Sequence, residues 1–412
     1  MNKGKSTNML PIGWTIVKLG DLCHTTSGGT PSRSKSQYYN GKIPWVKSGE
    51  LDKGIITSSE EKITEEAIKN SSAKVFPKGT LLIALYGATI GKLAFLGVDA
   101  ATNQAICGIY KNEKINSQFL YYFLFFKRPS LIKQGTGGAQ PNISQAIIKN
   151  LDVPLPPLSV QNFIVSKIEE HFSELDKGIE NLRLAQQQLK TYRQAVLKWA
   201  FEGKLTNENV KEGELPEGWK WKTLKEITSL LGDGLHGTPR YSDKGEFFFI
   251  NGNNLSDGKI VFKDSTKRVD INEYQKHKKE LNDTTILVSI NGTLGNTAFY
   301  NGEKVILGKS ACYFNLYPLV NKHYIRYIIT SQRFINYAEE TATGSTIPNV
   351  SLKAMREFTV PIPSIDEQIR IVQEIESRLS VADKTDKIIS DSLNRVESLR
   401  QSILKKAFEG ML

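Results

Sequence analysis

Leu10-Pro11-Ile12-Gly13-Trp14 returns 205 residues later as Leu215-Pro216-Glu217-Gly218-Trp219. Further along, Ala200-Phe201-Glu202-Gly203 returns as Ala407-Phe408-Glu409-Gly410, at an offset of 207 residues. A nearly constant offset indicates two copies of one unit, each about half of the chain. Two similar but non-identical halves favour a protein that binds two similar but non-identical targets.

The composition is that of a basic globular protein. The 412 residues, 39% of them hydrophobic, are enough for two to four domains with cores of their own. The formal net charge of +11 favours a polyanionic partner, most simply nucleic acid, although a basic surface can also be merely solvated. The surplus is diffuse, without a Lys- or Arg-rich tail, so charge alone leaves both interpretations open.

The sequence has few features that indicate where in the cell the protein lies. Three scattered cysteines, Cys23, Cys107 and Cys312, predict a reducing cytoplasm and offer neither a disulfide framework nor zinc spacing. No apolar run approaches the ~20 residues that span a bilayer. The first residues lack the apolar stretch of a secretory signal. We therefore expect a cytoplasmic protein without a membrane partner.

Each copy has the same internal order. A mixed segment with short strand-like runs between Gly, Asn, Ser and Asp turns comes first. A proline hinge follows at 153–157 and at 360–363, where extended backbone is expected because proline lacks an amide proton. A long helix follows each hinge. The predicted fold is α/β (α+β) with a pseudo-twofold internal repeat, in four segments: residues 1–150, 151–205, 206–357 and 358–412.

Both predicted helices carry apolar residues at intervals of seven. Such heptads, with Glu, Lys, Gln and Arg on the other faces, favour an antiparallel coiled coil between the two helices. Two separate amphipathic helices are the alternative. Helices of ~35–40 residues would be ~50–60 Å long and would form a rigid spacer. The predicted seam residues are Leu175, Leu182, Leu189 and Val196 in the first copy and Ala382, Ile389, Val396 and Ile403 in the second.

The linkers match the repeat as well. Residues 206–214 join the first helix to the second copy, residues 1–9 precede the first copy, and Leu412 corresponds to Leu205. The segments therefore follow one another as in a closed ring of two copies that has been opened within one of the two linkers. This layout suits two globular units held at opposite ends of an antiparallel helix pair.

The copies agree in framework and differ at polar loop residues. Gly29-Thr30-Pro31-Ser32-Arg33, for example, corresponds to Gly237-Thr238-Pro239-Arg240-Tyr241. Asn and Gln can read adenine, Arg and Lys guanine, and Ser or Thr either base or phosphate, so unequal loops predict that two base sequences are read. The alternative is that these polar residues only form turns, because turns require the same residue types. The predicted DNA-contacting residues are Thr30, Ser32, Arg33, Lys35, Lys47, Ser48, Tyr86, Thr89, Gln140 and Asn142 in the first copy, and Thr238, Arg240, Tyr241, Asn251, Asn253, Asn254, Asn291, Thr293, Ser345, Thr346 and Asn349 in the second.

Apparent catalytic motifs fail on inspection. Gly308-Lys309-Ser310 resembles the end of a phosphate loop, but the upstream glycine is missing at position 303 and a strand-like run follows. Glu60 and Glu61 beside Lys62 resemble part of a nuclease set, a pattern more typical of a solvated face. The five histidines lack ligand spacing. We predict neither a catalytic residue nor a metal site.

The repeated motifs together resemble a known family. The Leu-Pro-x-Gly-Trp starts, Ile43-Pro44-Trp45-Val46, the proline hinge before Gln161 and Ile164, and the Ala-Phe-Glu-Gly helix ends look like the specificity subunit of a type I restriction-modification system. The resemblance covers essentially the whole chain. Each motif is weak alone, and their repeated order is specific. The second copy departs from the pattern because it has no Pro-Trp at the position of 43–46.

This resemblance implies a division of labour. Residues 1–150 and 206–357 would each contain a target recognition domain that reads one half of a split, asymmetric site in double-stranded DNA. The coiled coil would set the gap. Two modification subunits, which carry S-adenosylmethionine and methylate adenine at N6, would dock on this chain, and restriction subunits that use ATP and Mg would join them. The chain itself would carry no cofactor and perform no catalysis.

Two other classes of function stay open at this point. A nuclease or methyltransferase complete in one chain would need cofactor or metal motifs that the sequence does not contain. A coiled-coil adaptor that binds only proteins would need neither the basic surplus nor the unequal polar loops.

Overall fold

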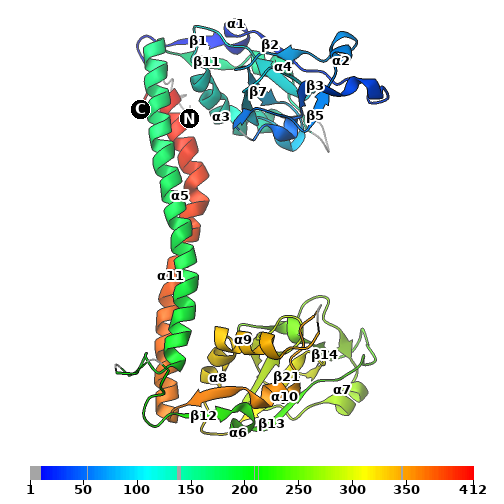
Figure 1. Cartoon of the computed structure of the whole chain (residues 1–412), viewed down its shortest axis with the longest axis vertical. Coiled ribbons are helices and arrows are strands. Elements are labelled where there is room, and N and C mark those ends of the chain that lie inside the picture. Colours follow the sequence, from blue (N-terminus) through cyan, green and yellow to red (C-terminus); the bar gives the residue numbers. More distant parts are fainter. Residues whose placement is uncertain (1–10, 53, 137–140, 208, 212, 345–346) are drawn as a thin grey trace, which may run out of the picture. The chain divides into compact units, whose positions relative to one another are not determined.

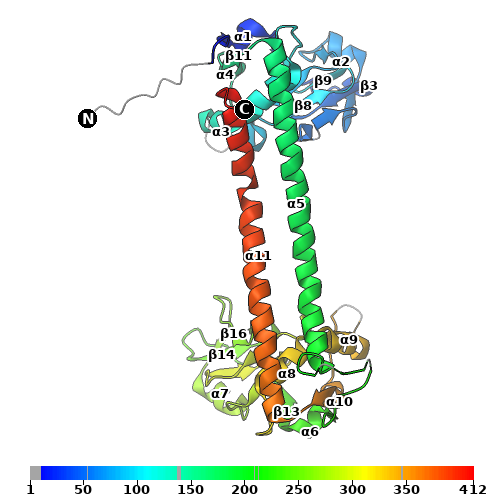
Figure 2. The same cartoon turned by 90° about the vertical axis from the view of Figure 1, so that its left-hand side faces the viewer.

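The computed structural model describes residues 11–52, 54–136, 141–207, 209–211, 213–344 and 347–412. The chain forms two compact units, the first made of Met1–Asn181 with Ser392–Leu412 and the second of Leu182–Asp391. Each unit combines one mixed segment with parts of both long helices, α5 (Leu158–Phe201) and α11 (Ile365–Phe408) (Figures 1 and 2). The mixed α/β class, the internal repeat and the packing of two long helices are therefore confirmed.

The first unit is built on two mixed sheets. One has the strand order β2-β10-β7-β8-β4 and the other β5-β3-β9-β6. All residues of β7 and β10 are buried, as expected for central strands between covering layers. The strands are β2 (Thr25–Ser27), β3 (Tyr39–Val46), β4 (Gly54–Ile56), β5 (Glu61–Ile63), β6 (Val75–Phe76), β7 (Leu81–Ala84), β8 (Leu93–Leu96), β9 (Ala100–Thr102) and β10 (Ile106–Ile109). The helices are α1 (Leu19–Leu22), α2 (Glu65–Lys69), α3 (Ser117–Gln134) and α4 (Gln145–Lys149).

The second unit repeats this plan with fewer paired strands. Its sheets have the orders β13-β21-β18-β19 and β17-β14-β20, and β14 pairs with β20 in parallel as β3 does with β9. The strands are β13 (Thr228–Asp233), β14 (Phe247–Ile250), β15 (Leu255–Ser256), β16 (Lys259–Ile260), β17 (Arg268–Val269), β18 (Thr285–Ser289), β19 (Thr297–Phe299), β20 (Val305–Leu307) and β21 (Ala311–Leu316). The helices are α6 (Leu224–Ile227), α7 (Ile271–His277), α8 (Lys322–Ile329), α9 (Gln332–Thr341) and α10 (Leu352–Glu357).

The proline hinges are strands that pair with the start of their own copy. β11 (Asp152–Leu155) pairs antiparallel with β1 (Thr15–Lys18), and β22 (Thr359–Ile362) pairs in the same way with β12 (Lys220–Thr223). Pro154 lies opposite Ile16 in the first ladder. A two-stranded ladder leaves one side of each strand free, so a residue without an amide proton is tolerated.

A buried glutamine joins each hinge to the following helix. Gln161 is fully buried, its Nε2 donates to Pro156 O at 2.9 Å, and its Oε1 accepts from Asn116 N at 2.8 Å. Gln368 makes the equivalent bonds to Pro363 and Asn321 at 3.0 and 2.8 Å. A buried amide that satisfies both of its ends fixes the angle at which each long helix leaves its hinge.

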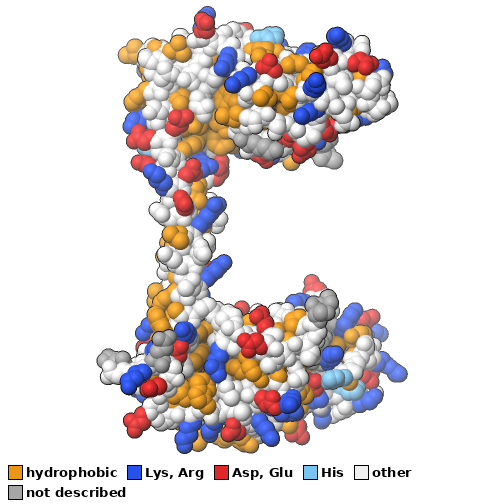
Figure 3. Space-filling view, in the orientation of Figure 1, with side chains coloured by type: hydrophobic (Ala, Val, Ile, Leu, Met, Phe, Trp, Pro, Cys, Tyr) orange, Lys and Arg blue, Asp and Glu red, His pale blue; other side chains and the backbone are white. Residues whose placement is uncertain are grey.

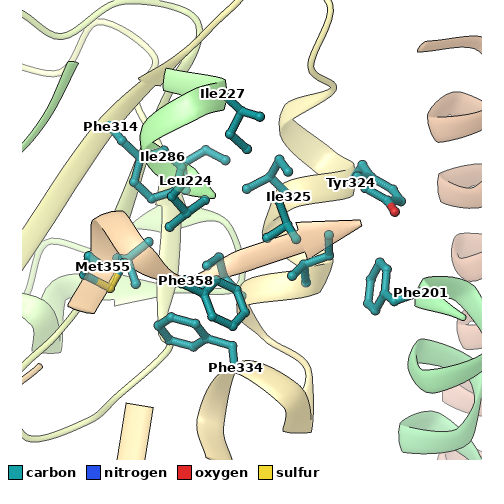
Figure 4. Packing of buried hydrophobic residues seen from close by; sticks show 14 of the residues in the cluster. Phe201, Leu224, Ile227, Ile286, Phe314, Tyr324, Ile325, Phe334, Met355 and Phe358 are labelled. Atoms are coloured by element: carbon teal, nitrogen blue, oxygen red, sulfur yellow. The ribbon is translucent and has the colours of Figure 1, made fainter. Parts of the chain in front are cut away.

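The two long helices share one buried apolar cluster in each unit. Members from both helices are Val196, Phe201, Ile371 and Ile375 in the second unit and Ile164, Ile168, Leu404 and Phe408 in the first. In the second unit, Phe201 at the end of α5 contacts Tyr324 of α8, and Phe334 packs edge-on against Phe358 (Figure 4). In the first unit, Phe408 of α11 packs on Phe119 of α3. Of the predicted seam residues, Val196, Ala382 and Ile389 are buried, and Leu175, Leu182, Leu189, Val396 and Ile403 are partly buried.

The end of each long helix packs against a Leu-Pro-x-Gly-Trp start. Gly203 follows α5 with a φ of +79°, and a Cβ there would collide with Pro216. Gly410 follows α11 with a φ of +72°, and a Cβ there would collide with Pro11. Glycine is required at both places because the backbone is left-handed and the proline lies against it. The start of the first copy therefore meets the end of α11 as the start of the second copy meets the end of α5.

Candidate nucleic-acid interface

In the first unit, the turn between β9 and β10 brings several predicted loops together. Asn103 N donates to Val46 O at 3.0 Å, and Leu85 N donates to Ala105 O at 2.8 Å. The hydroxyl of Thr30 also donates to Gln104 Oε1. The loops that carry Thr30–Lys35, Lys47–Ser48 and Tyr86–Thr89 therefore lie around one turn, 103–105.

The second unit has the same arrangement around the turn between β20 and β21. Gly308 N donates to Ile250 O at 2.8 Å, and Ile290 N donates to Ser310 O at 3.0 Å. Ser310 further holds the predicted residue Asn251, because its hydroxyl donates to Asn251 Oδ1 at 3.1 Å. Leu235 N, in the loop that leads to Thr238, donates to Leu307 O at 2.7 Å, so the same three loops are gathered around residues 307–310.

A second shared feature joins the loop after β7 or β18 to a distant loop. Tyr86 forms an antiparallel bridge with Asn142, and Asn291 forms the equivalent bridge with Asn349. In the second unit the side chains also bond, since Asn291 Nδ2 donates to Asn349 Oδ1 at 3.0 Å. The framework is the same in both units while the exposed chemistry differs: an aromatic ring stands in one and an amide in the other.

A charged cluster fills the first unit's surface beside Trp45. Arg33 makes two bonds to the Glu61 carboxylate, at 2.6 and 3.1 Å, and lies over Trp45 at 5.1 Å from the ring centroid. Lys47 contacts Glu60 at 2.9 Å and Glu61 at 3.1 Å. The bonds to Arg33 and then to Lys47 lower the pKa of Glu61, and those to the carboxylates raise the pKa of Arg33 and of Lys47. Two cations are thus held in fixed positions on an exposed surface.

The corresponding surface of the second unit has different side chains. Phe249 occupies the strand position of Trp45, and Lys267 lies opposite it, where the first unit has Glu61. Tyr241 packs against Phe249 with ring centroids 6.1 Å apart, and the Lys267 ammonium lies 5.8 Å from the Tyr241 ring. An arginine–carboxylate cluster in one unit is therefore matched by a tyrosine–lysine cluster in the other.

Sequence reasoning missed the residues at the tips of the two turns. Gln104 and Lys309 occupy equivalent positions, and both are exposed. The sequence contained a signal, because Gly308-Lys309-Ser310 stood out as a failed phosphate loop. Its place between two buried strands marked it as a tight turn with a free cation at the tip, a pattern that suits contact with a polyanion or with guanine.

The other predicted residues differ in how far they are exposed. Asn254 is buried, and its Nδ2 donates to Val261 O at 3.0 Å, so its amide holds the loop that presents Asn253. Gln140, Ser345 and Thr346 lie outside the described residues. Exposed residues are Ser32, Arg33, Lys35, Tyr86, Asn142, Thr238, Arg240, Tyr241, Asn253 and Thr293; partly buried ones are Thr30, Lys47, Ser48, Thr89, Asn251, Asn291 and Asn349.

Positive charge is dispersed over the visible faces of both units. Lys and Arg side chains alternate with Asp and Glu there and do not merge into one basic patch (Figure 3). Within the described part of the chain, no group of three or more His, Cys, Asp or Glu side chains could hold a metal ion. None of the helices described has the length and apolar character needed to cross a bilayer.

The paired architecture agrees with the comparisons to known proteins. Residues 11–183 and 216–398 each match the family model of the type I restriction modification DNA specificity domain. The chain belongs to this specificity-domain family. The resemblance in the repeated motifs is therefore confirmed over nearly the whole chain.

Individual members of the specificity family align with nearly all of this chain and with most of their own length. The EcoBI specificity subunit of Escherichia coli is 27% identical, covering 97% of this chain and 86% of that protein. The EcoKI specificity subunit of E. coli strain K12 is 25% identical, covering 99% and 91%. Among solved structures, the HsdS subunit from Thermoanaerobacter tengcongensis has the same fold, with a TM-score of 0.64 at 20% identity and 99% coverage of both chains. A chain from a structural study of type I R-M complex assembly gives 0.68 at 20% identity, covering 98% of this chain and 100% of that one.

Proposed function

We propose that this chain is the DNA sequence-specificity subunit of a type I restriction-modification complex, in which each unit reads one half of a bipartite, asymmetric site. One observation carries the proposal. The two units share strand pairings, turns and bridges, and they differ in the exposed side chains at equivalent positions, such as Gln104 against Lys309. Different donors and acceptors on one scaffold discriminate different base edges in the major groove.

Contacts to phosphate and to bases divide between the residues of each surface. Arg33, Lys35, Lys47, Arg240 and Lys244 supply cations for the backbone, which positions a duplex without reading its sequence. The amide, hydroxyl and aromatic side chains, together with Lys309 at its turn tip, supply the base readout. Bidentate contact to a base pair discriminates by ~1–3 kcal/mol, so a few such residues per unit suffice for a short half-site.

The helix pair and the partner subunits complete the proposal. Paired α5 and α11 serve as the spacer that sets the gap between half-sites. The chain binds two modification subunits, which bring S-adenosylmethionine and methylate adenine at N6, and restriction subunits, which bring ATP and Mg. Catalysis belongs to those partners, and the complex works in the cytoplasm. The competing adaptor function, binding proteins alone, does not explain why equivalent exposed positions carry different chemistry.

The test is single-molecule sequencing of methylated adenine in cells that express this chain with its modification subunit, compared with cells that lack only this chain. A split, asymmetric methylated motif that disappears with the chain is the expected result. Methylation that persists unchanged without the chain would contradict the specificity role. Methyl transfer or DNA cleavage by the purified chain alone would instead support the alternative of an enzyme that is complete in one chain.

A further inference from the structure

The loop after β13 is two residues longer than its counterpart after β2. Cys107 lies opposite Ser27 in the first unit, and Cys312 lies opposite Asp233 in the second, so Ser27 and Asp233 are equivalent. The next residue is glycine in both units, and each packs so closely on the neighbouring strand end that a Cβ would collide with backbone there. The first unit then continues directly with Gly-Thr-Pro, while the second inserts Leu235 and His236 before it.

The insertion is anchored at the turn that gathers the second unit's polar loops. Leu235 N donates to Leu307 O at 2.7 Å, and Leu235 forms a parallel bridge with Gly308. Leu235 is partly buried and His236 is exposed. The backbone just before His236 is therefore attached to the turn that carries Lys309, within the candidate interface.

A hydrogen bond fixes the chemistry of the exposed ring. His236 Nε2 lies 2.6 Å from Asp233 Oδ2, and the His236 side chain is 65% exposed while that of Asp233 is 19% exposed. An ionised carboxylate can only accept, so the proton of a neutral ring stays on Nε2. The Nδ1 lone pair is then a hydrogen-bond acceptor, whereas the ammonium of Lys309, at the tip of the turn that anchors this loop, only donates.

We infer that His236 is a base-reading residue of the second unit, whose Nδ1 accepts a hydrogen bond from the exocyclic amino group of adenine or cytosine in the major groove. Asp233 is its positioning residue. Adenine N6 and cytosine N4 are the amino donors that the major groove offers to an acceptor. The inference rests on the proposed function and assigns one base position in the second half-site to a loop that the first unit does not have.

The experiment is the methylated-adenine sequencing described above, performed on cells that express His236→Ala or Asp233→Asn in the full chain with its modification subunit. Both variants are expected to relax one position of the half-site read by the second unit. Discrimination there falls about tenfold for His236→Ala and less for Asp233→Asn, which keeps the side-chain shape. The half-site read by the first unit stays unchanged.

His171→Ala is the matched control, because the His171 side chain, 39% exposed, also lies beside a carboxylate, 3.5 Å from Glu174, but is on α5. An unchanged motif in His236→Ala would overturn the inference and leave the proposed function intact. A loss of methylation that is equal at every second half-site sequence would also overturn it, since that pattern marks a phosphate contact or a damaged loop. Failure of the wild-type chain to direct any methylation would refute the proposed function itself.

Discussion

Arg193 of α5 bonds to Asp383 of α11, and the equivalent pair joins Arg400 of α11 to Asp176 of α5, each residue offset by 207 from its counterpart. The Arg193 Nη1 to Asp383 Oδ1 distance is 2.5 Å. Arg400 contacts the Asp176 carboxylate in the first unit and also lies over the Phe172 ring. In each unit an arginine–aspartate pair thus links α5 to α11 at the border of the apolar seam. Charged pairs at such positions select register and orientation more than they add stability.

A charge reversal in the second unit tests this role. Asp383→Arg places two arginines together, and we expect it to destabilise the helix pair by about 1 kcal/mol, with Arg193→Asp in the same chain restoring most of the loss. The pair is partly exposed, so the gain from a correct pair is of the order 0.2–1 kcal/mol. Thermal unfolding of the wild type, the single variants and the double variant measures the coupling.

The equivalent pair in the first unit supplies the control. Asp176→Arg should behave as Asp383→Arg does, and Arg193→Asp should not rescue it. Rescue across the two pairs would show that the charges act through the net charge of the helices and not through a specific contact.

The buried glutamines predict a larger effect. Gln161→Leu removes the acceptor for Asn116 N and the donor for Pro156 O, and an unsatisfied buried group costs ~1–3 kcal/mol. We expect a loss of about 2–6 kcal/mol for two such groups, and the same loss for Gln368→Leu in the second unit. Denaturant unfolding of each full-length variant measures it. Gln188→Leu, at an exposed position of α5, should change the stability little, and an equal loss there would contradict the role assigned to the buried amides.

The sequence predicted the framework better than the interface. Heptads, proline hinges and Leu-Pro-x-Gly-Trp starts repeat because packing requires the same residues in both units, so comparing the copies exposes them. Gln104 and Lys309 were not predicted as DNA contacts because a turn tip on the surface carries no hydrophobic periodicity, and Gly308-Lys309-Ser310 was weighed only as a phosphate loop. Asn254 and Asn253 are neighbours of the same type, and only the fold shows that the first holds the loop and the second faces solvent. The inserted Leu235 and His236 become visible once strand register aligns the copies.

The turn tips should control the two half-sites separately. Gln104→Ala is expected to relax one position in the half-site of the first unit only, and Lys309→Ala one position in that of the second, each by ~1–3 kcal/mol of discrimination. Methylated-adenine sequencing of both variants reports the two half-sites in one experiment. A change in both halves from either variant would contradict modular reading.

Lys47 is expected to act on phosphate and not on a base. Its ammonium is held by Glu60 and Glu61, so it is placed in advance at the surface. Lys47→Ala should weaken binding of all sequences alike and lower the slope of log affinity against log salt by about 1. Titration of the assembled complex with DNA at several salt concentrations measures the slope. Lys177→Ala on α5 is the control. An equal change of the salt slope in that variant would contradict the assignment of Lys47 to a phosphate contact.

The stability of the second unit should fall on mild acidification. Burial lowers the pKa of His323, which packs on Phe299 with ring centroids 4.7 Å apart. Because the folded state holds this ring neutral, its contribution to stability is present above the ordinary histidine pKa near 6.5 and is lost as the pH falls through the lowered value. His323→Phe keeps the ring contact and should flatten the pH dependence. Thermal unfolding of both proteins between pH 7.5 and pH 5 shows the difference, and parallel curves would contradict it.

If α5 and α11 set the gap between the half-sites, a change in their length should change that gap. A heptad inserted after Leu182 in α5, together with one after its equivalent Ile389 in α11, preserves the seam because both helices gain the same seven residues. Seven residues add ~10.5 Å of helix, the rise of about 3 base pairs. We expect the methylated motif to keep both half-sites and to lengthen its gap by up to about 3 base pairs. A heptad in α5 alone should instead disrupt the pairing and abolish methylation. An unchanged gap with the matched insertion would show that the helices do not measure the spacing, and altered half-site sequences would show that the units do not read independently of them.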